Sequence, residues 1–137
     1  NTNLNSAFNL VSSVIGNMRD SGFGRIVHIS SVNGQKGQFG QTNYAATKSA
    51  LLGFSKSLAL EVASKGITSN VVAPGYINTE MVAAIREDIL KSIVDTIPSK
   101  RLGESDEIAD LVNFLITEQA AYINGATFSI NGGLRMD

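Results

Sequence analysis

Two residues four positions apart, Tyr44 and Lys48, carry the strongest chemical signal in this sequence. Residues at this spacing stack on one face of a helix, so the ammonium group can lie beside the phenol whatever the rest of the fold does. A positive charge roughly 5 Å away, at an effective dielectric constant of about 20, favours the phenolate by about 3 kcal/mol. The pair predicts a tyrosine poised for proton transfer, although the same spacing also occurs on solvated helix edges.

Ser31 closes a mostly apolar run, residues 25–31, and precedes the tyrosine by thirteen positions. Such a run indicates a buried strand, and ligands of open α/β sheets bind at the carboxyl ends of the strands. The intervening residues, 32–43, are rich in Gly, Gln and Asn, which favours a loop beside a pocket. The serine and the tyrosine–lysine pair are therefore expected at one ligand site.

The elements that must hold these residues alternate between helices and strands. Apolar spacing predicts helices over 3–19 and 44–64, a less regular helical segment over 79–97, and a helix that follows an N-terminal cap at Ser105. A mostly apolar run predicts a buried strand over 26–29. A second buried strand is predicted over 68–73, ending in a sharp turn at Pro74-Gly75, and a further strand over 127–130. This alternation indicates parallel βαβ crossovers and an α/β fold.

Composition excludes several classes of protein. The 137 residues are 43% apolar, enough for one domain with a core, and the net charge of −1 gives no argument for nucleic acid or anionic membrane as a partner. The absence of cysteine excludes disulfides and thiolate metal sites, and a single histidine argues against a histidine metal centre. No apolar run approaches the ~18 residues of a membrane helix, so a cytoplasmic protein is expected.

His28, on the strand predicted over 26–29, and Ser30, directly after it, lie two residues apart, a spacing that suggests a hydrolase hypothesis. The chain has no Gly-x-Ser-x-Gly nucleophile elbow, and strand alternation would bury both side chains in the sheet. Nucleophilic hydrolysis is therefore not the expected chemistry.

The chain resembles the short-chain dehydrogenase/reductase family. The resemblance is carried by Ser31, by Tyr44-x-x-x-Lys48, by an upstream Asn3, and by Pro74-Gly75 followed by Thr79. Within the family, residues 30–44 and 74–76 are most similar to acetoacetyl-CoA reductases, with the 3-oxoacyl-carrier-protein reductases as near neighbours. The resemblance implies a Rossmann-like, doubly wound parallel sheet and reduction of a short 3-oxoacyl thioester.

The same resemblance implies roles for individual residues. Tyr44 would give its proton to the substrate carbonyl oxygen while a nicotinamide hydride attacks the carbon, and Lys48 would assist the phenol and bind the nicotinamide ribose. Ser31 would donate a hydrogen bond to the same oxygen. Asn3 would hold a water of the proton relay, although an asparagine at a helix start is often only a cap.

The resemblance also implies binding residues and partners. The cofactor, NADPH with NADH left open, would contact Tyr44 and Lys48 and also Pro74, Gly75, Ile77 and Thr79. The acyl thioester would contact Gln38, Phe39, Gln41 and Tyr76, with a polar loop that binds no ligand as the alternative. A homo-oligomer, a dimer or tetramer, is expected because the helices over 3–19 and 44–64 pack across a subunit interface in this family.

One family feature is missing from the sequence. A dinucleotide-binding sheet should contain a glycine-rich turn between its first strand and helix. The glycines at 34, 37 and 40 have the wrong spacing and are interpreted as loop glycines. We therefore expect a single domain over 1–137 that forms the C-terminal catalytic half of the fold without its N-terminal half. The alternatives are a carrier-protein-dependent 3-oxoacyl reductase and a non-catalytic fragment that only oligomerises.

Overall fold

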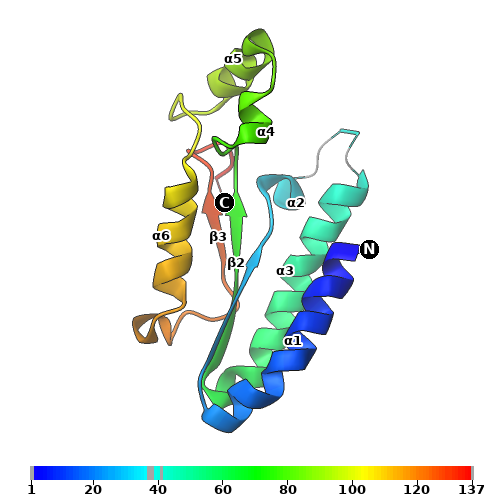
Figure 1. Cartoon of the computed structure of the whole chain (residues 1–137), viewed down its shortest axis with the longest axis vertical. Helices are drawn as coiled ribbons and strands as arrows, with labels where there is room; N and C mark the ends of the chain where they lie inside the picture. Colours follow the sequence, from blue (N-terminus) through cyan, green and yellow to red (C-terminus); the bar gives the residue numbers. More distant parts are fainter. Residues whose placement is uncertain (1, 37–38, 41, 137) are drawn as a thin grey trace.

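The computed structural model describes residues 2–36, 39–40 and 42–136, and it alternates strands with helices as the sequence predicts (Figure 1). Its α-helices and strands in chain order are α1 (Thr2–Ser21), β1 (Gly24–Ile29), α2 (Val32–Lys36), α3 (Thr42–Val62), β2 (Ile67–Pro74), α4 (Glu80–Ala83), α5 (Glu87–Thr96), α6 (Ser105–Leu115) and β3 (Thr127–Ile130). Two short 3₁₀ turns, η1 (Ala63–Lys65) and η2 (Glu118–Ala120), follow α3 and α6.

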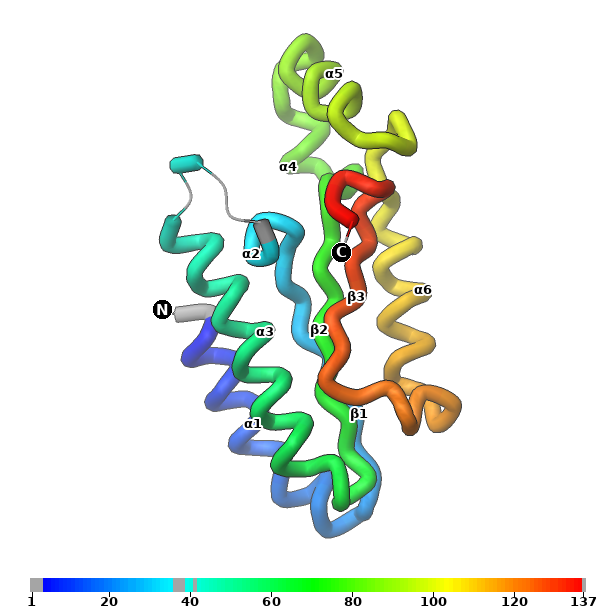
Figure 2. The backbone as a smooth tube through the Cα atoms, turned by 180° about the vertical axis from the view of Figure 1, so that it is seen from behind, coloured from blue at the N-terminus to red at the C-terminus, as the bar shows by residue number. Residues whose placement is uncertain are grey.

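The strands form one parallel sheet in the order β1-β2-β3, with Gly24 opposite Ile67 and Val71 opposite Thr127. Helices α1 and α3 lie side by side on one face of the sheet and α6 lies on the other (Figures 1 and 2). Helices α4 and α5 extend beyond the carboxyl end of β2. This layered arrangement confirms the predicted Rossmann-like α/β class.

The core lies where α3 and α1 cover the sheet. On α3, Leu51, Leu58 and Val62 are buried, whereas Phe54 is only partly buried. Strand β2 is buried without interruption from Ile67 to Ala73, because helices cover both of its faces and strands flank both of its edges. Among the described residues, no helix combines the length and the apolar character needed to cross a membrane.

Burial of β1 differs from the prediction. The sequence suggested a strand buried on both faces, but only alternate residues such as Ile26 and His28 are buried, and Ile29 is 45% exposed. In the described sheet β1 is an edge strand, so one set of its alternating side chains is less completely covered. The sequence pattern alone did not distinguish an edge strand from a central one.

Two local boundaries were also predicted wrongly. The segment expected to be a loop over 32–43 contains the short helix α2, and the cap of α6 is Glu104 instead of Ser105. The backbone N–H of Glu104 donates to the Glu107 carboxylate at 2.8 Å, which satisfies a donor that the helix itself leaves open. Gly66 ends the α3–η1 segment with a φ of 72°, as expected of a glycine that adopts the left-handed conformation.

The side-chain amides of Asn70 and Asn124 stabilise the segment that leads into β3. The side chain of Asn70 donates to the Ile123 carbonyl at 2.8 Å and accepts from the Ala126 N–H at 3.0 Å. The Ser69 N–H in turn donates to the Asn124 side chain at 2.8 Å. These bonds replace water for buried polar groups and fix the start of β3 against β2.

The buried His28 gives a pH-dependent prediction. Its imidazole packs edge-on against Phe54 with ring centres 5.4 Å apart, and its Nε2 finds no hydrogen-bond partner in the described part of the chain. Burial lowers the pKa of His28, so below the usual value of about 6.5 the unfolded chain binds the proton more readily than the folded one. We expect the free energy of unfolding to fall by up to about 1.4 kcal/mol per pH unit as the pH drops from about 6.5.

Urea unfolding between pH 7.5 and 5 measures this slope. His28→Asn, which cannot gain a proton in this range, should remove the histidine's share of the slope. An unchanged slope in that variant would contradict the prediction.

Candidate active site

Tyr44 and Lys48 occupy one face of the first two turns of α3, as their spacing predicts. The Lys48 ammonium lies 5.6 Å from the centre of the Tyr44 ring. Tyr44 is 44% exposed, so its phenol is accessible to a ligand from solvent. The helix therefore presents a phenol and a cation together at its surface.

Hydrogen bonds connect this part of α3 to the end of β1. The Lys48 ammonium donates to the Ile29 carbonyl at 3.2 Å. In the opposite direction, the Ser30 hydroxyl donates to the Lys48 carbonyl at 3.0 Å. An ammonium has three N–H donors, so Lys48 can hold the strand end and still donate to a ligand.

Ser31 follows directly at the carboxyl end of β1. Its Oγ accepts a hydrogen bond from the Asn33 N–H in α2 at 3.2 Å. A hydroxyl that accepts in this way keeps its own O–H as a donor. The structure thus places the Ser31 hydroxyl two residues from the carbonyl that binds Lys48, at the end of the sheet where ligands of open α/β folds bind.

The Pro74-Gly75 motif stays close to the sheet. Gly75 donates its N–H to the Ile130 carbonyl at 2.9 Å, and a Cβ at Gly75 would lie 2.8 Å from the Asn131 Cβ. Glycine is required here because β2 and the end of β3 approach each other so closely. The sequence predicted a sharp turn and a cofactor contact at this glycine but did not indicate its packing role.

Beyond Gly75, the chain pairs with the segment that precedes α6. Ile77 forms a parallel bridge with Gly103, and the Asn78 N–H donates to the Gly103 carbonyl at 2.7 Å. Thr79 caps α4, its hydroxyl accepting from the Val82 N–H at 3.3 Å. The helical segment predicted over 79–97 is present as α4 and α5. The bridge between Ile77 and Gly103 joins the chain just before this segment to the chain after it.

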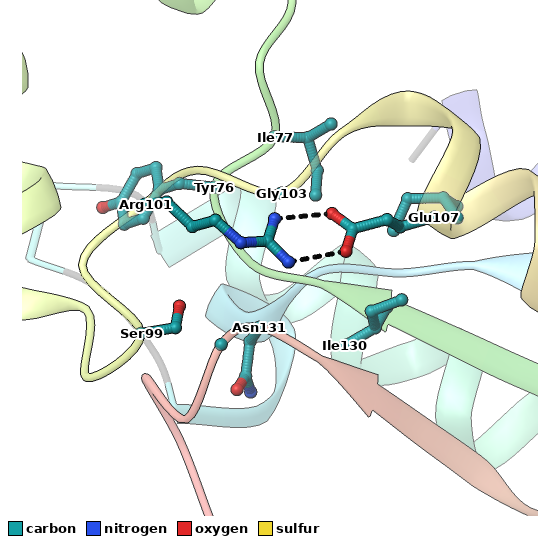
Figure 3. A pocket seen from close by; sticks show the side chains of 10 residues that line it. Tyr76, Ile77, Ser99, Arg101, Gly103, Glu107, Ile130 and Asn131 are labelled. Atoms are coloured by element: carbon teal, nitrogen blue, oxygen red, sulfur yellow. Dashed lines mark hydrogen bonds and ion pairs between the residues drawn. The ribbon is translucent and has the colours of Figure 1, made fainter.

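A pocket of about 90 Å³ opens between these segments and the end of β3 (Figure 3). Tyr76, Ile77 and Asn131 line it, and Arg101 crosses it to bind both oxygens of Glu107 at 2.7 and 2.8 Å. This bidentate pair lowers the pKa of Glu107 to about 2, so Glu107 is a carboxylate at neutral pH. The sequence does not indicate this pair, because Arg101 precedes the cap of α6 and Glu107 lies within the helix, so no single helical or strand period relates them.

Several predicted residues are placed only in part. Asn3 belongs to the first turn of α1, but its side chain lies outside the described residues, as do Gln38 and Gln41. Phe39 is fully exposed between α2 and α3. Tyr76, expected beside the acyl group, lines the Arg101–Glu107 pocket and is half-buried.

Comparison with known proteins decides the family. A family model described as enoyl-(acyl carrier protein) reductase, one of the short-chain dehydrogenases/reductases, matches residues 1–135. The chain belongs to the short-chain dehydrogenase/reductase family. This assignment confirms the family resemblance that the serine and the tyrosine–lysine motif carried.

Relatives within the short-chain dehydrogenase/reductase family are similar over almost the whole chain. The chain is 59% identical to an acetoacetyl-CoA reductase of Cupriavidus necator over 135 residues, which are 98% of this chain and 55% of the relative. It is 58% identical to an acetoacetyl-CoA reductase of Shinella zoogloeoides, covering 97% of this chain and 56% of the relative. It is 52% identical to a 3-oxoacyl-(acyl-carrier-protein) reductase of Escherichia coli, covering 98% and 55%. The chain thus spans about half the length of these relatives.

Proposed function

We propose that the protein carrying this chain is an oxidoreductase that reduces a short 3-oxoacyl thioester, of the acetoacetyl-CoA type, to the 3-hydroxyacyl thioester. The observation that supports this most is the Tyr44–Lys48 pair hydrogen-bonded to the end of β1 beside Ser31. Relatives named acetoacetyl-CoA reductase, at 59% and 58% identity, support the same substrate class.

In the proposed reaction the ketone oxygen gains negative charge as a hydride reaches the carbonyl carbon. Tyr44 donates the proton that this oxygen takes up, and the nearby Lys48 cation stabilises the phenolate left behind. Ser31 donates a hydrogen bond to the same oxygen. Donors held in place before the reaction would meet this charge without rearrangement.

The donor chemistry of the site fits a nicotinamide cofactor. Because Lys48 binds the Ile29 carbonyl with one N–H, its others can bind the hydroxyls of a ribose. Pro74 ends β2, with Gly75, Ile77 and Thr79 just beyond it. By family resemblance, these residues would contact the nicotinamide end of the cofactor. When bound, the nicotinamide would supply the hydride, and by family resemblance we propose NADPH.

The acyl thioester would enter from the surface where Phe39 and Tyr44 are exposed. A fully exposed phenylalanine can cover the apolar part of a thioester chain, and the neighbouring Gln38 and Gln41 are proposed to bind its polar groups. Tyr76 is half-buried next to this end of the sheet and would form another part of the acyl site.

Assembly into a homo-oligomer is part of the proposal. Helices α1 and α3 expose Phe8 and Leu10 at 57% and 67% and Leu60 at 86%, and a groove of about 340 Å³ runs between the two helices. Arg19 and Glu61 lie at this groove, so a second copy could pair the opposite charges while covering the apolar side chains. We propose a dimer or tetramer formed through this face.

A steady-state assay with NADPH tests the function on the full protein. We expect acetoacetyl-CoA to be reduced, with the oxidation of NADPH followed at 340 nm, and the same preparation to have the mass of a dimer or tetramer by light scattering. Absence of turnover with any 3-oxoacyl thioester would contradict the proposal.

The second candidate function is a 3-oxoacyl-carrier-protein reductase, favoured by the 52% identical relative of that name. The same assay with acetoacetyl carrier protein separates the two. A kcat/KM at least tenfold higher for the CoA thioester would support the first candidate, and the reverse preference would support the second.

A further inference from the structure

We propose that Gly34 is a positioning residue for the reaction, because its lack of a side chain lets α3 approach α2 closely enough for Lys48 to reach the end of β1. This inference rests on the proposed function for its effect on turnover. Its structural part, the contact between Gly34 and the backbone of Lys48, is independent of that function.

The approach at Gly34 is very close. A Cβ added there would lie 2.5 Å from the Cβ of Lys48 and 2.9 Å from its carbonyl carbon. These are the fixed parts of Lys48 rather than the end of a flexible side chain, so a rotamer change cannot relieve the overlap. The Ser30 Oγ would also lie 3.0 Å away.

Hydrogen bonds around Gly34 stabilise the same contact between α2 and α3. The Ser49 hydroxyl donates to the Gly34 carbonyl, while the Gly34 N–H donates to the Ser31 carbonyl at 3.0 Å. The Ser30 hydroxyl donates to the Lys48 carbonyl. These bonds connect the end of β1, α2 and the turn of α3 that carries Lys48, with Gly34 at the point where the two helices touch.

Backbone conformation does not explain why a glycine stands here. Gly34 is a helical residue of α2 and does not belong to the glycines with positive φ. An alanine would suit the helix itself better than glycine. Steric approach to Lys48 is therefore the physical reason for glycine, and an added methyl group must push α2 and α3 apart.

Displacement of α3 would act on the chemistry through Lys48. The ammonium binds the Ile29 carbonyl at 3.2 Å, close to the limit for a hydrogen bond, so a shift of the helix by a few tenths of an ångström weakens this bond. Tyr44 lies on the same helix face and moves with it. A misplacement of about 1 Å of reacting groups can cost on the order of 10²-fold in rate.

Gly34→Ala, compared with Gly53→Ala, tests the proposal in the full protein. Gly53 is a matched control because it lies in α3 and a Cβ there would meet nothing within 4 Å. We expect Gly34→Ala to lower kcat about 10²-fold, with the KM for the thioester changed by less than about threefold. Gly53→Ala should keep both within about twofold. A kcat for Gly34→Ala that matches the control would overturn the proposal.

Crystal structures of the two variants supply a measurement that does not depend on turnover. In Gly34→Ala the distance from Lys48 Nζ to the Ile29 carbonyl oxygen should exceed 3.5 Å, whereas in Gly53→Ala it should remain near 3.2 Å. An unchanged distance in Gly34→Ala would refute the positioning role. If the wild-type protein shows no turnover, the proposed function fails, and this distance still decides the role of Gly34.

Ser49→Ala keeps the proposal testable if Gly34→Ala does not fold. This variant removes the hydroxyl that holds the Gly34 carbonyl, and adds no atoms. We expect a roughly fivefold lower kcat with an unchanged KM, and a thermal midpoint lower by a few degrees because the buried Gly34 carbonyl loses its hydroxyl donor. A kcat equal to wild type in a folded Ser49→Ala protein would count against the contact between α2 and α3 as the positioning element.

Discussion

Replacing Tyr44 by phenylalanine is expected to lower kcat for acetoacetyl-CoA about 10²–10⁴-fold, the usual contribution of a positioned general acid. The variant removes one hydroxyl and keeps the ring that lies 5.6 Å from the Lys48 ammonium. The ketone oxygen would then have to take its proton from water. Steady-state kinetics at saturating NADPH measures the loss.

Cofactor affinity separates this effect from general damage to the site. Nicotinamide fluorescence should show that Tyr44→Phe binds NADPH within a few-fold of wild type, since the Lys48 ammonium and the end of β2 remain in place. Tyr122→Phe is the matched control, because Tyr122 is fully exposed in the connection between η2 and β3. Retained turnover in Tyr44→Phe would refute the proposed mechanism.

Replacing Ser31 by alanine is expected to lower kcat about 10²–10³-fold, the typical loss when one donor to a developing oxyanion is removed. The thioester KM should change little, because the missing hydrogen bond strengthens mainly as charge develops on the ketone oxygen. The Asn33 N–H also loses its acceptor, so the free energy of unfolding should fall by about 1 kcal/mol.

Two further variants distinguish the hydroxyl from the packing at Ser31. Ser31→Thr keeps a hydroxyl and should recover much of the lost kcat. Ser13→Ala removes a hydroxyl that donates to the Leu10 carbonyl on the exposed surface of α1, and should leave kcat unchanged. Equal kcat values for Ser31→Ala and Ser31→Thr would show that the hydroxyl is not what the reaction needs.

Glu107 of the Arg101–Glu107 pair is interpreted as a structural residue and not as a proton-transfer residue. A carboxylate in a pocket is a natural candidate for proton transfer, but both oxygens of Glu107 bind Arg101 and its pKa is about 2. Such a group stays ionised at neutral pH and is a poor general acid or base. We interpret the pair as support for the segment between α5 and α6.

Much of the fold could be predicted because its signals are local. A buried strand predicted over 68–73 lies within β2, and the strand over 127–130 was predicted with the bounds that β3 has. The helical face shared by Tyr44 and Lys48 follows from the pitch of a helix alone. Parallel pairing followed from the alternation of strands and helices, since a parallel connection needs a crossover of that length.

Errors in the prediction arose where the outcome depends on strand order or on side-chain hydrogen bonds that residue spacing does not specify. The exposure of Ile29 depends on β1 being an edge strand of the described sheet. Helix α2 and the cap at Glu104 depend on which side chain reaches an open backbone donor, Ser31 in one case and Glu107 in the other. The roles of Asn3, Gln38 and Gln41 and the choice of NADPH stay predictions of the family resemblance.

Residue types and short spacings, which the covalent chain fixes, were enough to predict the family and the α/β class, and both predictions are confirmed. The contact of Lys48 with the end of β1 and the close approaches at Gly34 and Gly75 arise instead from the packing of helices and strands. Whether a glycine is a flexible loop residue or a point of contact depends on what packs against it. The distance from a glycine to its neighbours is set by the joint packing of helices and strands, and residue spacing along the chain does not specify that packing.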